Sequence, residues 1–204
     1  MKLKILFIAL ISHLSLNAQN DSIANTKEYA KNLGVSLNSN ISTIYGNTAY
    51  FLEGNMVYKI HPKFNIGLFS FGFYSYQKII ESSTKKQSLY GYASGVLIEP
   101  VMLENKSFII SLPIKFGLGA IGYTNDSLNN IIQDQDINTP DWDPFQLWEF
   151  GASFTTPRNK TLQFISTLSY RTTNRFELIK NKTKSISGFS IGIGLRWYFL
   201  TIKN

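Results

Sequence analysis

The feature that most constrains the fold is a strict alternation of residue types along the stretch 107–123, SFIISLPIKFGLGAIGY. Every second residue from Phe108 to Leu118 is large and apolar, whereas the residues between them include Pro113, Lys115 and Gly117. A period of two is typical of a β-strand, because a helix would spread Lys115 around its surface and hold Pro113 in its interior. The apolar face is also about as long as a tilted strand that crosses a bilayer.

The same alternation recurs in four other stretches: 89–100, 145–154, 161–171 and 188–199. In each, one face is bulky and apolar, and the other is mostly glycine, serine and alanine with an occasional charge. Small residues and charges suit a narrow lumen, so the bulky face is expected to meet lipid. The alternative is a soluble periplasmic barrel of the lipocalin type, which requires the bulky faces to point inward.

We therefore expect an all-β fold, an eight-stranded antiparallel transmembrane β-barrel with up-and-down meander topology. The connections at 61–63, 103–106 and 156–160 are short, and those at 79–86, 125–144 and 177–184 are longer and polar. In outer-membrane barrels the short turns face the periplasm, so both termini are expected there. The third strand changes parity midway, which predicts a bulge. The expected strands are 33–46, 48–61, 63–78, 87–101, 106–124, 145–156, 160–176 and 185–201.

The N-terminal sequence MKLKILFIALISHLSLNAQN has a basic start, an apolar run and a small residue, Ala18, before Gln19. This arrangement predicts a secretory signal peptide at 1–18, and the apolar run is short for a spanning helix. An uncleaved N-terminal anchor is the alternative. We expect a periplasmic leader at 19–32 and the outer-membrane β-barrel domain at 33–204.

Aromatic residues cluster near the expected strand ends, as in the two interfacial girdles of membrane proteins. The last strand carries a glycine followed by two late aromatics, Gly194, Trp197 and Phe199, which resembles the targeting signal on the final strand of outer-membrane barrels. The expected outer girdle is Tyr45, Tyr50, Tyr74, Tyr76, Tyr90, Tyr92 and Tyr123, and the inner girdle is Tyr58, Trp197 and Phe199.

The segment 90–123 joins a glycine-rich strand, a Glu-Pro pair, a short turn, an apolar strand and a Gly-x-Gly. This pattern, together with the LNAQN ending of the signal, resembles an uncharacterised subgroup of the small outer-membrane β-barrel proteins of Bacteroidetes. They fall within the eight-stranded class that includes the OmpA transmembrane domain and OmpX. The resemblance implies the fold and an integral outer-membrane location, and it carries no catalytic residue.

Six charged residues have the inward parity of this barrel. Because unpaired buried charge is costly, the three acids and three bases are expected to pair. One interpretation is a structural plug of salt bridges, and the other is an ion or proton path gated by those pairs. The six residues are Glu53, Glu99, Glu149, Lys115, Arg171 and Arg196.

The connection 125–144 is acidic and contains no lysine or arginine. A solvated surface loop, a Ca²⁺ site with oxygen ligands and a partner-binding loop anchored by Trp142 are the three interpretations, although the spacing is not that of an EF-hand. Its acids are Asp126, Asp134, Asp136, Asp141 and Asp143.

The residue types of the chain argue against a catalytic or metal site in the barrel. The chain has no cysteine, His13 lies in the signal, and His61 lies in a predicted periplasmic turn. We therefore expect no enzyme, no catalytic residue, no cofactor and no metal. The positive charge is scattered, which argues against nucleic-acid binding.

The function expected from the sequence is a structural or surface-interaction barrel with a lumen plugged by side chains. Small-solute or ion transport and lipid modification are the alternatives. The expected partners are outer-membrane lipid and lipopolysaccharide, and the barrel-assembly machinery during biogenesis.

Overall fold

The structure is a computed structural model, and it describes residues 31–77, 87–124, 142–156, 162–174, 176–177 and 183–202. The expected signal peptide and all of the leader except its last two residues lie outside these ranges. All described strands belong to one compact unit, Ala30–Lys203. Among the described residues, no helix is long and apolar enough to cross a membrane.

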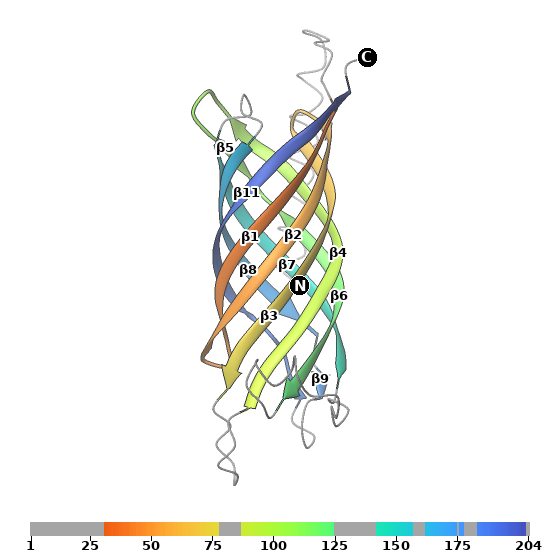
Figure 1. The fold of residues 1–204 in the computed structure, drawn as a ribbon, viewed down its shortest axis with the longest axis vertical. Helices are drawn as coiled ribbons and strands as arrows, with labels where there is room; N and C mark the ends of the chain where they lie inside the picture. The colour runs from red at the N-terminus through yellow and green to blue at the C-terminus, as the bar shows by residue number, and fades with distance from the viewer. Residues whose placement is uncertain are drawn as a thin grey trace, which may run out of the picture. The chain divides into compact units, whose positions relative to one another are not determined.

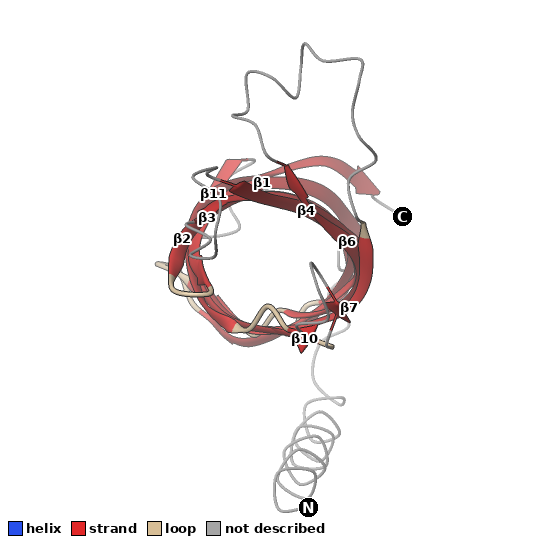
Figure 2. Cartoon of the chain, turned by 90° about the horizontal axis from the view of Figure 1, so that it is seen from below, coloured by secondary structure: helices blue, strands red, loops and turns tan. Residues whose placement is uncertain are grey.

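Eight strand positions close into an antiparallel barrel (Figure 1). Each strand pairs with its neighbour in the chain, and the last strand pairs with the first, which closes the ring seen in Figure 2. The expected eight-stranded up-and-down barrel is confirmed. The strands are β1 (Lys31–Ile44), β2 (Asn47–His61), β3 (Phe64–Gln77), β4 (Gln87–Glu104), β5 (Ile109–Ser111), β6 (Ile114–Thr124), β7 (Asp143–Thr155), β8 (Leu162–Thr173) and β11 (Gly188–Ile202), with β5 and β6 sharing one position. A separate two-stranded sheet joins β9 (Phe176–Glu177) to β10 (Thr183–Lys184).

The two ends of the barrel differ in their connections. At the end we call the short-turn end, β2 turns into β3 at Pro62 and Lys63, and β4 turns into β5 at 105–108. At the other, the long-loop end, the connections after β3, β6 and β8 are longer. The β1–β2 turn at the long-loop end is short, and its two residues Tyr45 and Gly46 both have positive φ, 51° and 78°. Positive φ at both central residues is what a two-residue type I′ hairpin requires.

The stagger of the strands follows from their register. Following paired residues once around the ring leads from Tyr198 to Gly188 on the same strand, a stagger of ten residues. Strand number and stagger together set barrel width, and eight strands enclose an interior just wide enough for side chains. The row runs through Tyr198, Gly34, Val57, Gly67, Leu97, Lys115, Glu149, Arg171 and Gly188.

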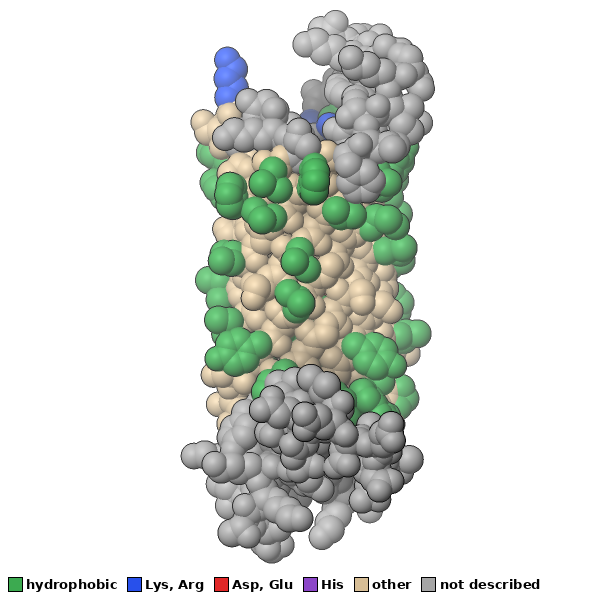
Figure 3. Space-filling model, viewed as in Figure 1, with side chains coloured by type: hydrophobic (Ala, Val, Ile, Leu, Met, Phe, Trp, Pro, Cys, Tyr) green, Lys and Arg blue, Asp and Glu red, His purple; other side chains and the backbone are tan. Residues whose placement is uncertain are grey.

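The outer face of the barrel is a belt of exposed large apolar side chains (Figure 3). Ile193 on β11 is 71% exposed and Phe164 on β8 is 64% exposed, values far above those of core residues. The bulky residues of the predicted alternation therefore point outward. A soluble lipocalin-like barrel requires the opposite arrangement, with its bulky residues inside. Other members of this belt are Leu37, Ile41, Leu52, Leu118, Leu168, Phe189, Ile191 and Trp197.

Two expectations about individual strands are wrong. The strand expected at 106–124 is broken into β5 and β6 at Leu112 and Pro113, because proline has no N–H for the ladder. The two-residue period survives the break, so Ser111 and Lys115 both point inward. The bulge expected in the third strand is absent: the pairing of β3 with β4 is continuous, and the irregularity lies in β2 between Lys59 and His61.

Candidate functional site

The candidate site is the interior of the barrel, where the structure places all six charged residues expected to face inward. Each of them is at most 7% exposed. They come from six different strand positions, and the stagger brings them into two separate groups. The first group, the charge network, is Glu53, Lys115, Glu149 and Arg171, and the second, the cross-bore pair, is Glu99 and Arg196.

Three members of the charge network are direct cross-strand neighbours. Lys115 on β6 lies opposite Glu149 on β7, which lies opposite Arg171 on β8. Lys115 Nζ is 2.8 Å from Glu149 Oε1, and Arg171 Nε donates to Glu149 Oε2 at 2.7 Å. The fourth member, Glu53, reaches Lys115 from β2 across the bore, with Oε2 2.6 Å from Nζ. The network contains two acids and two bases, so it is neutral.

The cross-bore pair joins β4 to β11, which lie four positions apart in the ring of eight. Arg196 Nη2 is 3.0 Å from Glu99 Oε2. Ser111 Oγ donates to Glu99 Oε1 at 2.6 Å, and Asn65 Nδ2 donates to Glu99 Oε2 at 3.2 Å. The bore is therefore crossed by a second neutral ion pair with additional hydrogen bonds.

Amide side chains complete the hydrogen bonding of Glu53. Asn38 Nδ2 and Asn55 Nδ2 both donate to Glu53 Oε1, at 3.1 and 2.8 Å. A buried carboxylate is costly unless its oxygens accept hydrogen bonds from charged or polar donors. Glu53 meets this condition through one ammonium and two amides.

An aromatic cluster fills the bore toward the long-loop end. The rings of Phe51 and Phe73 are stacked, with centroids 5.2 Å apart and planes inclined by 28°, and Phe51 meets Phe71 edge-on at 5.6 Å. The Arg171 guanidinium lies over both Phe51 and Phe71, 4.0 and 4.6 Å from the ring centroids. These contacts join the charge network to the aromatic cluster. The apolar residues packed together here include Phe51, Phe69, Phe71, Phe73, Leu89, Ala93, Ile121, Phe145 and Leu147, all at most 5% exposed.

The sequence analysis missed this apolar half of the interior, because it expected the inward residues to be mostly small, with an occasional charge. A signal was present in the third strand, where Phe69, Phe71 and Phe73 alternate with Ser70 and Gly72. In this part of the third strand the phenylalanines point inward, and Ser70 and Gly72 point outward. The inward and outward positions of this strand therefore alternate without a break. What changes along it is that the large residues Ile66 and Leu68 face outward, whereas Phe69, Phe71 and Phe73 face inward.

Inward glycines make room for these bulky side chains. A Cβ at Gly117 would lie 2.7 Å from the ring of Phe69, and a Cβ at Gly192 would collide with the side-chain amide of Asn40. In both cases the added Cβ would lie closer to its neighbour than Cβ atoms do in real proteins. The glycines on one wall thus accommodate side chains from the facing or neighbouring wall.

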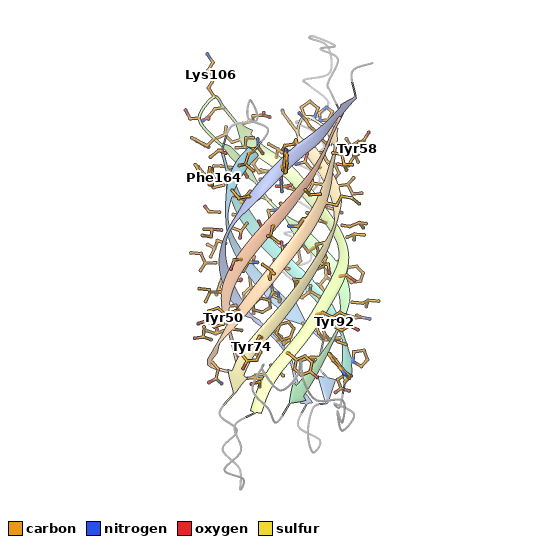
Figure 4. All side chains as sticks on the ribbon, viewed as in Figure 1. Tyr50, Tyr58, Tyr74, Tyr92, Lys106 and Phe164 are labelled. Carbon is orange, nitrogen blue, oxygen red and sulfur yellow. The ribbon has the colours of Figure 1, made fainter. Side chains whose placement is uncertain are left out.

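The aromatic residues at the strand ends lie as expected where the structure describes their side chains. Tyr50, Tyr74 and Tyr92 lie toward the long-loop end and Tyr58 toward the short-turn end (Figure 4). The side chains of Tyr76, Tyr123 and Phe199 are outside the described set.

Four of the five acids of the 125–144 connection, Asp126, Asp134, Asp136 and Asp141, lie outside the described residues. Asp143 is the first residue of β7 and is partly buried. Trp142 packs on the outer face of the barrel against Tyr90 and Tyr92, with ring centroids 5.0 and 5.8 Å apart. Among the residues that the structure describes, no three His, Cys, Asp or Glu side chains are grouped as metal ligands.

His61 is exposed at the short-turn end, and its Nδ1 accepts a hydrogen bond from the backbone N–H of Lys63 at 3.3 Å. It thus lies at the end of the barrel opposite to the aromatic cluster. His13 lies outside the described residues.

No protein-family model and no curated protein matches this chain. Solved structures do match it. The crystal structure of Neisserial surface protein A is 8% identical, with a TM-score of 0.57, and the match covers 83% of this chain and 97% of that chain. The outer membrane protein OprG from Pseudomonas aeruginosa is 13% identical, with a TM-score of 0.47 and coverages of 83% and 96%. Ail, the attachment invasion locus protein of Yersinia pestis, is 10% identical, with a TM-score of 0.43 and coverages of 83% and 97%.

At 8% identity the match to Neisserial surface protein A is a likeness of fold. Together with the register and the outward apolar belt, it identifies the architecture of this chain as the closed, antiparallel, eight-stranded transmembrane β-barrel.

Proposed function

We propose that this protein is an integral outer-membrane β-barrel with a structural or surface-interaction role, whose lumen is plugged by its own side chains. The observation that carries the proposal is the pairing of an apolar outer belt with a filled interior. Only a closed barrel satisfies all backbone hydrogen bonds of strands that lie in lipid. The belt supplies the lipid-facing surface that such a barrel needs.

The filled interior argues for anchoring rather than transport. Lys115 reaches Glu53 and Arg196 reaches Glu99 across the bore, and the phenylalanine cluster packs the bore on the long-loop side. A pore would need these contacts to open together. The remaining functional surfaces are the outer belt and the connections at the two ends.

The orientation and processing are part of this proposal. In outer-membrane barrels short turns face the periplasm and long loops face outward, which would make the short-turn end and both termini periplasmic. Residues 1–18 would be removed as a signal peptide and 19–32 would form the leader. The resemblance of the 90–123 segment supports a Bacteroidetes type of barrel. Its partners would be outer-membrane lipid and lipopolysaccharide, and the assembly machinery during biogenesis.

The lipid-modifying alternative has little support in the described residues. His61 is at the short-turn end, and the inward serine Ser111 donates to a carboxylate that is already paired with Arg196. A serine nucleophile needs an adjacent base that is available to take its proton.

Fractionation combined with heat modifiability tests the proposal. The full chain is expressed with its N-terminal segment, membranes are washed with salt and carbonate, and the pellet is run on a gel with and without boiling. We expect the protein to stay in the outer-membrane pellet and to change mobility on boiling. Recovery in the soluble periplasmic fraction would overturn the proposal.

A further inference from the structure

We propose that the outer face of β2, β3 and β4 is an interface at which two copies of this barrel associate side by side in the membrane. The association rests on the proposed outer-membrane barrel and assigns a partner to one part of its lipid-facing belt. The polar centre of the interface is formed by the hydroxyl groups of Ser70 and Ser94. We call the residues Gly54, Ser70, Gly72 and Ser94 the serine face.

The serine face interrupts the apolar belt at the middle of the strands. Gly54, Ser70 and Ser94 are direct cross-strand partners, and Gly72 follows Ser70 on the same side of β3. All four residues are exposed, and Gly54 and Ser70 lie halfway along β2 and β3. Figure 3 shows this side of the barrel, where large apolar side chains are fewer at mid-height than at the edges. The small residues therefore lie at the depth where the surroundings of a membrane barrel are hydrocarbon.

A shallow groove follows the serine face. Leu37 on β1 lies beside Gly54 and is 59% exposed, and Leu118 on β6 lies beside Ser94 and is 62% exposed. A groove next to protruding leucines suits a two-fold contact, because each copy offers its protruding side chain to the groove of the other. The lining of the groove includes Gly54, Ser70 and Ser94 together with Met56, Leu68 and Val96.

The hydroxyl groups favour protein over lipid as the occupant of this groove. Within the described part of the chain, neither Ser70 Oγ nor Ser94 Oγ makes a hydrogen bond. Hydrocarbon offers no hydrogen bond, and a hydroxyl placed in it without a partner costs free energy. A serine hydroxyl both donates and accepts, so the same serine from two copies can pair. A second barrel therefore satisfies these side chains, and an acyl chain does not.

The direction of insertion restricts how two copies can meet. Both copies have their short-turn ends on the same side of the membrane, so a two-fold axis between them runs parallel to the barrel axes. Residues across such an axis meet at equal depth. Ser70 lies between Gly54 and Ser94 in the row, and we place the axis beside it. Small residues then let the two backbones approach closely, as they do between membrane helices.

The opposite side of the barrel provides a comparison within the same molecule. Ser166 is an exposed serine on the outer face of β8, which lies four positions from β3 in the ring of eight. Its cross-strand partners are Ile193 and Phe154, which are both large and exposed. These side chains hold a neighbouring barrel away from Ser166. An outward serine therefore occurs in two settings, and only the serine face admits a second backbone.

Single cysteines test the interface, because the chain has no cysteine of its own. Ser70→Cys and Ser166→Cys are introduced into the full chain, and isolated outer membranes are treated with an oxidant or with a short apolar bismaleimide. The bismaleimide detects the contact even where the two thiols are too far apart for a disulfide. We expect Ser70→Cys to give on the order of tenfold more linked dimer than Ser166→Cys, because a disulfide requires two Cα atoms within about 7 Å. Equal yields at the two positions, or no dimer at Ser70→Cys, would overturn the interface.

Ser94→Leu distinguishes a second copy from lipid as the occupant. The added side chain is compatible with lipid but obstructs the approach of another backbone. In the Ser70→Cys chain we expect Ser94→Leu to lower the yield of linked dimer to that of Ser166→Cys. Ala152→Leu, at an exposed position on the outer face of β7, is the control and should leave the yield unchanged.

An undiminished yield in the Ser94→Leu chain would overturn the interface. Failure of the proposed function has a different signature, because the protein would then be lost from the outer-membrane pellet. A barrel that stays in the pellet and changes mobility on boiling, but gives no dimer at Ser70→Cys, overturns only the association of two copies.

Discussion

Glu99 and Arg196 meet inside the barrel although they lie on strands that do not pair, with Nη2 of the arginine 3.0 Å from Oε2 of the glutamate. Their strands, β4 and β11, are diametrically placed in the ring. The pair therefore holds opposite walls at a fixed separation, which cross-strand hydrogen bonds alone do not do.

Arg196→Met should destabilise the barrel by about 3–5 kcal/mol, because it leaves Glu99 buried without its counter-charge. The double variant Arg196→Met with Glu99→Gln should recover part of this loss, since it removes both charges. Urea unfolding in detergent micelles, followed by the unboiled gel band, measures the free energy of unfolding. Lys106→Met, at the exposed β4–β5 turn shown in Figure 4, is the matched control and should change stability by less than about 0.5 kcal/mol. Equal effects at both positions would contradict a structural role for the pair.

Arg171→Lys keeps the charge next to Glu149 but removes the planar group that lies over Phe51 and Phe71. We expect a loss of about 1–3 kcal/mol in the free energy of unfolding. The substitution Phe51→Leu is then measured in the chain with Arg171 and in the Arg171→Lys variant. Its loss in the free energy of unfolding should be smaller in the variant, and the difference is the contribution of the stacking. Identical costs of Phe51→Leu in the two backgrounds would show that the stacking contributes nothing.

Gly192→Ala should destabilise the barrel by about 1–3 kcal/mol, because the added methyl group collides with the side chain of Asn40. The nearest atoms are side-chain atoms, so Asn40→Ala in the same chain should restore much of the stability. Gly54→Ala is the control on the outer face, where the nearest atom to an added Cβ is 4.0 Å away. Unfolding midpoints of the three variants check this, and an undiminished loss in the double variant would contradict the packing described.

Because the outer belt is expected to face lipid, an arginine placed on it should lower the free energy of unfolding by an amount that depends on its depth in the membrane. Ile193→Arg places an arginine at a 71% exposed position well inside β11, and Ile60→Arg places one near the short-turn end. In lipid vesicles the first should cost about 2–4 kcal/mol and the second about 0–1 kcal/mol. Folding titrations in vesicles measure both. Equal, small costs would mean that the belt does not lie in hydrocarbon.

The strands and their inward and outward faces were largely predictable from the sequence, because a side-chain period of two is a local property. This is why Lys115 could be assigned to the inner face even though Pro113 breaks the strand just before it. The pairing of Lys115 with Glu53 and of Arg196 with Glu99 was not predictable. It depends on the ten-residue stagger, which is a property of the whole closed ring.

The phenylalanine cluster was missed for a related reason. Alternation shows that Phe69, Phe71 and Phe73 share one face, but it does not say which face is inside. The residues around the third strand decide this, because Gly91 leaves space for the ring of Phe73 and Gly117 leaves space for the ring of Phe69. Only the three-dimensional register reveals that complementarity.

The most direct test of the central claim is the conductance of the purified, heat-modifiable barrel in a planar lipid bilayer. Ion pairs that cross the bore and a packed layer of buried aromatic rings should leave the membrane without stable channel currents at moderate voltage. Steady, reproducible single-channel steps from the folded protein would contradict the account, because they would require a continuous water path past Phe51, Phe71 and Phe73.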